Sequence, residues 1–140
     1  MVVGGLGNDT ITTGTGDDVV LGDNGAGTYT PGTTQLLQVK TAGVVGGSAG
    51  SDTIIAGDGD NVVVAGVGTD TVTTGSGVDL IVGDNGQIDW TASGVYSEFQ
   101  TTDPTLGAGD TIQAGDGDNT VAGGFGGDTI TTGVGEDLIL

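Results

Sequence analysis

The sequence predicts an all-β protein, a flattened parallel solenoid of short strands, on three observations. A nine-residue pattern recurs along the chain, Gly accounts for 32 of the 140 residues, and Ile, Val or Leu follows each acidic, Gly-rich turn. A three-residue strand cannot form a stable sheet alone, but stacked copies can pair with the copies above and below. Two nonapeptides are expected to make one coil of the solenoid.

Each nonapeptide consists of six turn residues followed by three extended residues. Gly at the second and fourth places supplies turn angles that other residues rarely adopt, and β-branched residues at the last three places favour a strand. Eight clear copies cover residues 4–12, 13–21, 56–64, 65–73, 74–82, 114–122, 123–131 and 132–140. With two weaker copies included, the eighth-place residues predict an inward-facing core of Ile11, Val20, Ile54, Val63, Val72, Ile81, Ile112, Val121, Ile130 and Ile139.

A longer repetition of about sixty residues is superimposed on the nonapeptides. We expect residues 1–140 to be one continuous solenoid segment of a longer repeat chain, with long repeats at about 4–64, 65–122 and, in part, 123–140. Each complete long repeat reaches GDNG and then leaves the pattern, which gives inserts at about 26–46 and 87–105. Alternating polar and apolar residues in both inserts predict a β-hairpin or an arch.

Tyr29 and Trp90 hold equivalent places in the two inserts. Large aromatic side chains favour burial, so we expect them to plug the core or to pack under the insert. A sugar-stacking platform is the alternative.

The two faces of the solenoid differ in polarity. Strands that read TIT or TVT present Thr outward, whereas strands that read VVL, LIV or LIL present the apolar residues Val19, Leu21, Leu80, Val82, Leu138 and Leu140. A long exposed apolar strip is unfavourable in water. Either the inserts or another molecule is therefore expected to cover this face.

The composition excludes several classes of function. The net charge is −18, with one basic residue, no His and no Cys. A Ser-His-Asp or Cys-His site, a thiolate zinc site and an arginine clamp on phosphate all need side chains that are missing. Nucleic acid and anionic membrane surfaces are repelled by such a charge, and no apolar stretch is long enough to enter a bilayer. We therefore expect that the chain is not an enzyme.

An acidic, Gly-rich composition is also typical of disordered proteins. A chain that is disordered in the absence of a ligand therefore remains an alternative to the folded solenoid.

The nonapeptide resembles GGxGxDxUx, in which U is apolar, the calcium-binding repeat of RTX (repeats-in-toxin) proteins. The eight clear copies and the weaker SAGSDTII and GAGDTIQ spread this resemblance over more than half of the chain. It implies a parallel β-roll, Ca²⁺ ions held between successive turns on the same edge, and type I secretion by a bacterium. The GDNG element followed by an insert is similar to repeats of very large bacterial surface or matrix proteins of this class.

The chemistry of the turns also favours calcium, which binds six to eight oxygen atoms from carboxylates and carbonyls. Gly-rich turns expose carbonyls, and stacked turns would align carboxylates with almost no positive charge to offset them. Magnesium fits less well because it keeps its water shell. The alternative is that Asp merely favours tight turns. The sixth-place acids are Asp9, Asp18, Asp52, Asp70, Asp79, Asp110, Asp128 and Asp137.

Turns alternate between two edges, so calcium ligands are expected to come from nonapeptides two apart. This pairs Asp52 with Asp70, Asp110 with Asp128, and the turns of Asn61 and Asn119 with Asp79 and Asp137, respectively. Asn61 and Asn119 stand where an acid is expected, so each of those sites lacks one charge. The acids of the same turns, which either compensate or face solvent, are Asp58, Asp60, Asp116 and Asp118. Asp23 and Asp84, in the two GDNG elements, complete the candidate calcium ligands.

These features together predict a calcium-stabilised structural segment of a secreted bacterial repeat protein, located outside the cell or on its surface. It would act as a spacer, an adhesin stalk or an extracellular matrix filament. Its expected partners are calcium and further copies of the same repeat, bound end to end or through the apolar face. One alternative is an ice-binding or other binding module that uses the Thr face, weakened by the interrupting inserts. Another is the RTX tail of a secreted enzyme.

Overall fold

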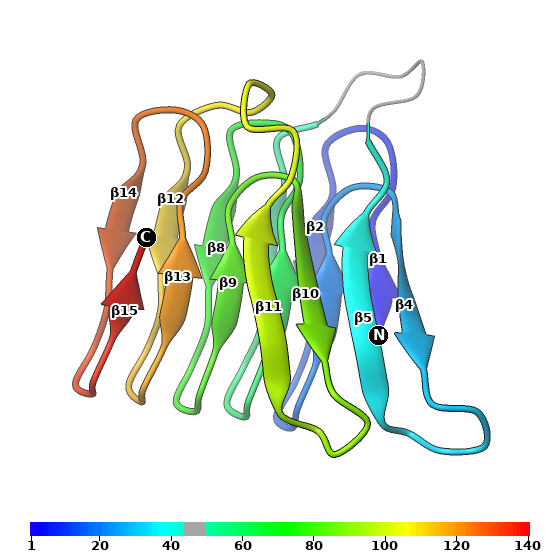
Figure 1. The fold of residues 1–140 in the computed structure, drawn as a ribbon. Coiled ribbons are helices and arrows are strands. Elements are labelled where there is room, and N and C mark those ends of the chain that lie inside the picture. Colours follow the sequence, from blue (N-terminus) through cyan, green and yellow to red (C-terminus); the bar gives the residue numbers. More distant parts are fainter. Residues whose placement is uncertain (44–49) are drawn as a thin grey trace.

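The computed structural model describes residues 1–43 and 50–140, which form three β-sheets (Figure 1). The predicted all-β class is confirmed, because the described residues contain no helix. Two of the sheets are parallel and face each other, an arrangement consistent with a β-roll. The third sheet is antiparallel and is built from the two inserts.

The first parallel sheet, here called the apolar sheet, has the order β1-β3-β7-β9-β13-β15. Its strands are β1 (Val2–Val3), β3 (Val19–Leu21), β7 (Val62–Val64), β9 (Leu80–Val82), β13 (Thr120–Ala122) and β15 (Leu138–Ile139). The second, here called the threonine sheet, has the order β14-β12-β8-β6-β2. It contains β2 (Thr10–Thr12), β6 (Thr53–Ile55), β8 (Thr71–Thr73), β12 (Thr111–Gln113) and β14 (Thr129–Thr131).

Successive roll strands alternate between these two sheets, so each strand pairs with strands of neighbouring coils. Val63, for example, lies in register with Val20 on one side and Ile81 on the other. This pairing supplies the hydrogen bonds that a three-residue strand cannot make by itself. The predicted stacking of repeats is therefore what forms the sheets.

The core between the two parallel sheets is formed by the eighth-place residues. A single buried cluster contains Ile11, Val20, Ile54, Val63, Val72, Ile81, Ile112 and Val121, together with three small residues, Ala56, Ala65 and Ala114. Ile130 is half-buried against this cluster. Ile139 was expected inside but is 51% exposed, because its strand β15 lies at the end of the sheet and, among the described strands, pairs with β13 alone.

Both inserts are β-hairpins. The first is formed by β4 (Gly25–Tyr29) and β5 (Leu36–Thr41), and the second by β10 (Gly86–Trp90) and β11 (Tyr96–Thr101). The hairpins join through β5 and β10, which gives an insert sheet of order β11-β10-β5-β4. Gln38 of β5 donates a hydrogen bond to Asp89 of β10 at 2.7 Å across this junction. Residues 44–46 of the first expected insert lie outside the described residues.

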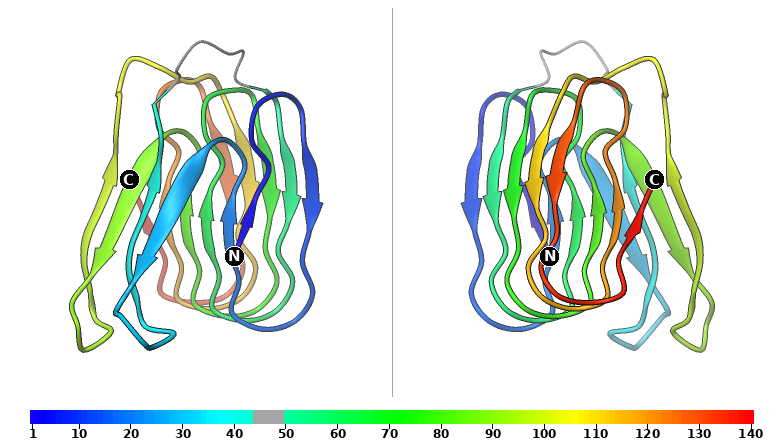
Figure 2. Two further views of the ribbon diagram at one scale, coloured as in Figure 1. Left: turned by 90° about the vertical axis from the view of Figure 1, so that its right-hand side faces the viewer. Right: turned by 90° about the vertical axis from the view of Figure 1, so that its left-hand side faces the viewer.

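The insert sheet covers the outer face of the apolar sheet, so the molecule has three layers (Figure 2). Val39 and Ile88 of the inserts, both fully buried, pack against the outward-facing residues Leu21, Val62, Val64, Leu80 and Val82. Each such buried side chain contributes roughly 1.5–3 kcal/mol. The sequence predicts that either the inserts or another molecule covers the apolar face. The inserts cover it from β3 to β9, while Leu138 and Leu140 are 49% and 65% exposed.

The last Gly of each GDNG element allows the hairpin to fold back. A Cβ on Gly86 would lie 2.8 Å from a methyl carbon of Val82, and one on Gly25 would lie 2.9 Å from a methyl carbon of Leu21. Such distances are too short for real Cβ atoms, so a larger residue would push the insert off the apolar sheet.

Candidate metal sites at the turn edges

The sixth-place side chains form two rows, one along each edge of the roll. Within each row, the backbone N–H of one sixth-place residue donates a hydrogen bond to Oδ1 of the sixth-place residue in the next coil. The N···O distances are 2.7–3.1 Å. The insert edge, from which the hairpins leave, carries Asp9, Asp52, Asp70, Asp110 and Asp128. The plain edge carries Asp18, Asn61, Asp79, Asn119 and Asp137.

The structure brings together all the pairs that the sequence predicts. Asp52 and Asp70 are neighbours in the insert row, as Asn61 and Asp79 are in the plain row, each 18 residues apart. Across an insert, however, the neighbours are 40 or 43 residues apart, as for Asp70 and Asp110 or Asp9 and Asp52. Counting nonapeptides alone misses these contacts, because the inserts lengthen the sequence without adding a coil.

The second carboxylate oxygen of most insert-edge acids is buried and has no hydrogen-bond donor in the described part of the chain. Within the described residues this holds for Oδ2 of Asp9, Asp52, Asp70 and Asp110, and on the plain edge for Oδ2 of Asp79. Asp52, Asp70 and Asp110 are each at most 2% exposed. A buried oxygen of this kind is strongly unfavourable unless a proton or a cation neutralises it.

The pKa values of these acids also indicate that their charged forms are unfavourable in this environment. Burial, helped by the charges of Asp110 and Asp52, raises the pKa of Asp70 to about 8. Burial, with the charges of Asp84 and Asp128, raises the pKa of Asp110 to about 7. Burial likewise raises the pKa of Asp52. At neutral pH these carboxylates therefore favour binding either a proton or a cation.

Backbone oxygens converge with these carboxylates at the first-place glycines. A Cβ on Gly22 would meet the carbonyl oxygen of Ala65 and Oδ2 of Asp52. A Cβ on Gly83 would meet the carbonyl oxygen of Gly123 and Oδ2 of Asp110 in the same way. The space beside each glycine is thus faced by the carboxylate and carbonyl oxygens that Ca²⁺ prefers.

Side chains alone are not enough for such a site. Over residues 1–43 and 50–140, no group of three or more acidic side chains is arranged to hold a metal ion. An ion between two turns therefore needs backbone carbonyls as well as carboxylates, a donor set that suits Ca²⁺.

The two GDNG acids lie at the roots of the inserts, beside the insert edge. Oδ2 of Asp23 accepts the N–H of Val67 at 2.8 Å, and Oδ2 of Asp84 accepts the N–H of Phe125, so each acid ties an insert root to the next coil. Oδ1 of both acids is buried without a partner among the described residues. Burial raises the pKa of Asp23 and, with the charge of Asp128, raises the pKa of Asp84 to about 6.

Asn61 and Asn119 have a different environment from the acids of their row. Nδ2 of Asn61 donates to the carbonyl oxygens of Gly57 and Gly59 and to Oδ1 of Asp79, at 2.9–3.1 Å. Nδ2 of Asn119 makes the equivalent contacts, to the carbonyl oxygens of Gly115 and Gly117 in its own turn and to Oδ1 of Asp137 in the next coil. The turns that were expected to lack one charge therefore contain a hydrogen-bond donor in its place.

The other acids of these turns stay outside the buried row. Asp58, Asp60, Asp116 and Asp118 are exposed, and each accepts one backbone N–H from the next coil, those of Ser76, Val78, Val134 and Glu136, respectively. These four side chains therefore face solvent, which is one of the two positions that the sequence analysis allows for them.

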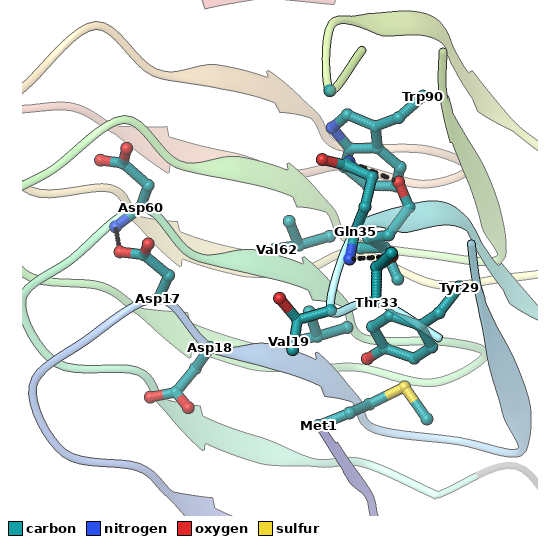
Figure 3. A pocket seen from close by; sticks show the side chains of 13 residues that line it. Met1, Asp17, Asp18, Val19, Tyr29, Thr33, Gln35, Asp60, Val62 and Trp90 are labelled. Atoms are coloured by element: carbon teal, nitrogen blue, oxygen red, sulfur yellow. Dashed lines mark hydrogen bonds between the residues drawn. The ribbon is translucent and has the colours of Figure 1, made fainter. Parts of the chain in front are cut away.

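A surface groove runs between the plain edge and the hairpin tips (Figure 3). Two adjoining hollows share Asp60, Val62, Trp90 and Gly94. Trp90 is half-buried against the apolar layer, and Tyr29 is 40% exposed at one end of the groove. Both aromatic side chains thus line the groove under the inserts, and neither enters the core between the parallel sheets.

The described residues contain no helix that is long and apolar enough to cross a membrane.

No curated protein and no solved structure matches the chain. The family model of the RTX calcium-binding nonapeptide repeat, however, matches in 4 copies, over residues 1–29, 46–81 and 106–139. These ranges contain every residue of the insert row and the plain row. Repeats of this family are structural elements that bind several calcium ions per array. The chain therefore belongs to the family of RTX calcium-binding nonapeptide repeat proteins.

Proposed function

We propose that this chain is a calcium-stabilised structural segment of a secreted bacterial repeat protein, with the role of a spacer, an adhesin stalk or a filament of the extracellular matrix or cell surface. In this proposal the roll has two nonapeptides per coil, and calcium holds successive coils together. The observation that supports it is the row of buried carboxylate oxygens on the insert edge, which have no donor among the described residues.

The calcium ligands on the insert edge would be Asp9, Asp52, Asp70, Asp110 and Asp128, assisted by turn carbonyls such as that of Ala65. Those on the plain edge would be Asp18, Asp79 and Asp137. Asp23 and Asp84 would add a further carboxylate oxygen at each insert root. Bound calcium supplies the positive charge that these residues lack, since the whole chain has one basic side chain.

Calcium would also determine where the chain folds. At low cytosolic calcium the acids within each row would repel one another, and this repulsion would favour an open chain that can be exported. At millimolar extracellular calcium, sites with dissociation constants of roughly 0.1–1 mM would fill, and the binding free energy would become folding free energy. Each ion would join two coils, so the folded roll would resist extension along its axis.

A calcium titration followed by circular dichroism tests this proposal. We expect the β signal to rise as calcium increases to about 10 mM, and magnesium to have a much smaller effect. The proposal is wrong if the β signal does not rise, or if magnesium acts equally well.

One observation favours a second candidate, the binding of ice or of another regular surface through the threonine sheet. The inserts lie over the opposite face, so they do not interrupt the Thr array as the sequence led us to expect. Five exposed Thr side chains form an unbroken row in register: Thr10, Thr53, Thr71, Thr111 and Thr129. The neighbouring row is broken by Ile55 and Gln113.

Thermal hysteresis of the calcium-saturated protein tests this candidate. Activity that disappears when Thr53, Thr71 and Thr111 are replaced together by Val, but survives Thr28→Val on the insert, would support it. Absence of hysteresis in the unmodified folded protein would rule out ice binding.

A further inference from the structure

Asp and Asn alternate along the plain edge, in the order Asp18, Asn61, Asp79, Asn119, Asp137. We propose that the side-chain amides of Asn61 and Asn119 take the place of a calcium ion in their turns. The plain edge then has two metal-free links between coils, alternating with turns that bind calcium. This inference rests on the proposed calcium-dependent folding of the roll.

The geometry of the Asn61 amide is the first reason. Nδ2 lies inside its own turn, 3.0 Å from the carbonyl oxygen of Gly57 and 2.9 Å from that of Gly59. It also lies 3.1 Å from Oδ1 of Asp79 in the next coil. Two carbonyls of one turn and a carboxylate of the next are the oxygens that an ion between two turns would bind. The amide thus directs its two N–H groups at these three oxygens, at the place where an ion would otherwise lie.

The hydrogen-bond network also fixes the orientation of the amide. Oδ1 of Asn61 accepts the backbone N–H of Asp18 at 3.1 Å, while Nδ2 faces three oxygen atoms. The flipped amide would place its oxygen against those three oxygens and its N–H₂ against a backbone N–H. Asn119 repeats the arrangement, with its Oδ1 on the N–H of Asp79 at 3.0 Å and its Nδ2 on three oxygens at 3.1 Å.

A comparison with the insert edge gives the second reason. In Asp52, Asp70 and Asp110, Oδ1 has the same role as in Asn61. Their second atom is also an acceptor, and it stays buried without a donor from residues 1–43 or 50–140. Neither Asn61 nor Asn119 has an unpartnered buried atom among the described residues. Replacing Oδ2 by an N–H₂ group therefore removes a negative charge and supplies the donors for which the acids would need a cation.

Calcium stoichiometry tests this inference. Isothermal titration calorimetry of Asn61→Asp and Asn119→Asp is expected to show about one additional Ca²⁺ per substitution, because each turn regains the carboxylate of the other sites. Asn8→Asp is the matched control. Asn8 is exposed, and its single side-chain hydrogen bond to the described residues is the one that Oδ1 accepts from the N–H of Ser51. Asp can keep this role, so the variant should bind as many ions as the unmodified chain. Unchanged stoichiometry in folded Asn61→Asp and Asn119→Asp would overturn the inference.

Two further measurements decide the question if those variants do not fold. Asp70→Asn on the insert edge should fold and bind about one ion fewer, because its new amide can donate where calcium bound before. In the calcium-saturated unmodified chain, NMR should show slow hydrogen exchange for the side-chain amides of Asn61 and Asn119 and fast exchange for that of exposed Asn8. Equal exchange of the three amides would overturn the inference.

The inference and the proposed function can fail separately. A chain that does not gain β structure with calcium contradicts the proposed function. A chain that folds with calcium, and whose Asn61→Asp variant folds without binding an additional ion, contradicts only the role of the amides.

Discussion

Oδ1 of Asp70 accepts the backbone N–H of Asp52 at 2.7 Å, while Oδ2 of the same carboxylate is buried and has no donor among the described residues. One oxygen thus links two coils through the backbone, and the other is left in an environment that favours a proton or a cation. The same division recurs at Asp52 and Asp110. Because the chain supplies almost no positive charge, this relationship makes the stability of the roll depend on its ionic surroundings.

Without calcium, the roll is expected to be more stable in mild acid than at neutral or alkaline pH. Burial raises the pKa of Asp70 to about 8 and that of Asp110 to about 7, well above the ordinary value of 3.8. The folded chain therefore holds protons that the unfolded chain releases. This stabilisation is fully present below about pH 4 and is lost as pH rises through about 7–8. Circular dichroism of the calcium-free chain should show more β structure at low pH.

In saturating calcium the pH dependence should have the opposite sign, because protons then compete with calcium for the same carboxylates. If the calcium-free chain gained β structure on going from about pH 4 to about pH 8, the explanation based on raised pKa values would be wrong.

Removing an insert-edge carboxylate should weaken calcium-dependent folding. Asp70→Ala deletes the acceptor for Asp52 N–H and one candidate ligand. Asp118→Ala deletes an exposed Asp whose one side-chain hydrogen bond to the described residues comes from Glu136 N–H. A hydrogen bond to a charged group contributes about 1.5–3 kcal/mol. We therefore expect Asp70→Ala to raise the calcium concentration at the folding midpoint at least about tenfold. Asp118→Ala should raise it much less, and equal effects would argue against a special role for the insert edge.

The first-place glycine at an insert root should be required for calcium binding. In Gly83→Ala the added methyl group would meet Oδ2 of Asp110 and the carbonyl oxygen of Gly123, and so would push apart the oxygens proposed to bind the ion. Gly127→Ala is the control, since a Cβ there meets no atom of the described residues within 4 Å. Calorimetry should show weaker calcium binding or fewer ions for Gly83→Ala only. Similar binding by both variants would place the ion elsewhere.

The insert sheet should contribute to stability even when calcium is saturating. Ile88 is fully buried between the inserts and the apolar sheet, so Ile88→Ala should lower the free energy of unfolding by about 2–5 kcal/mol. Ile55→Ala removes the same atoms from a side chain that is 43% exposed on the threonine sheet, and should cost much less. Denaturant unfolding in saturating calcium measures both. If the two losses were equal, the insert sheet would not be a stabilising layer.

Local periodicity in the amino-acid sequence is enough to predict the two parallel sheets and the core between them. Six Gly-rich turn residues and three β-branched residues define each strand, and the eighth place selects side chains such as Val63 and Ile81 for the interior. The same periodicity aligned the sixth-place acids and so predicted the pairing of Asp52 with Asp70.

The arrangement of the inserts and the difference between the two edges depend on contacts between residues far apart in the sequence. The pairing of β5 with β10 joins hairpins that are far apart in the sequence, and no local pattern specifies which face they cover. The contact of Asp9 with Asp52 skips a whole insert, so it cannot be found by counting repeats. The role of Asn61 depends on the turn carbonyls beside it and on Asp79 in the next coil, because a hydrogen bond is decided by which atoms the fold brings within reach.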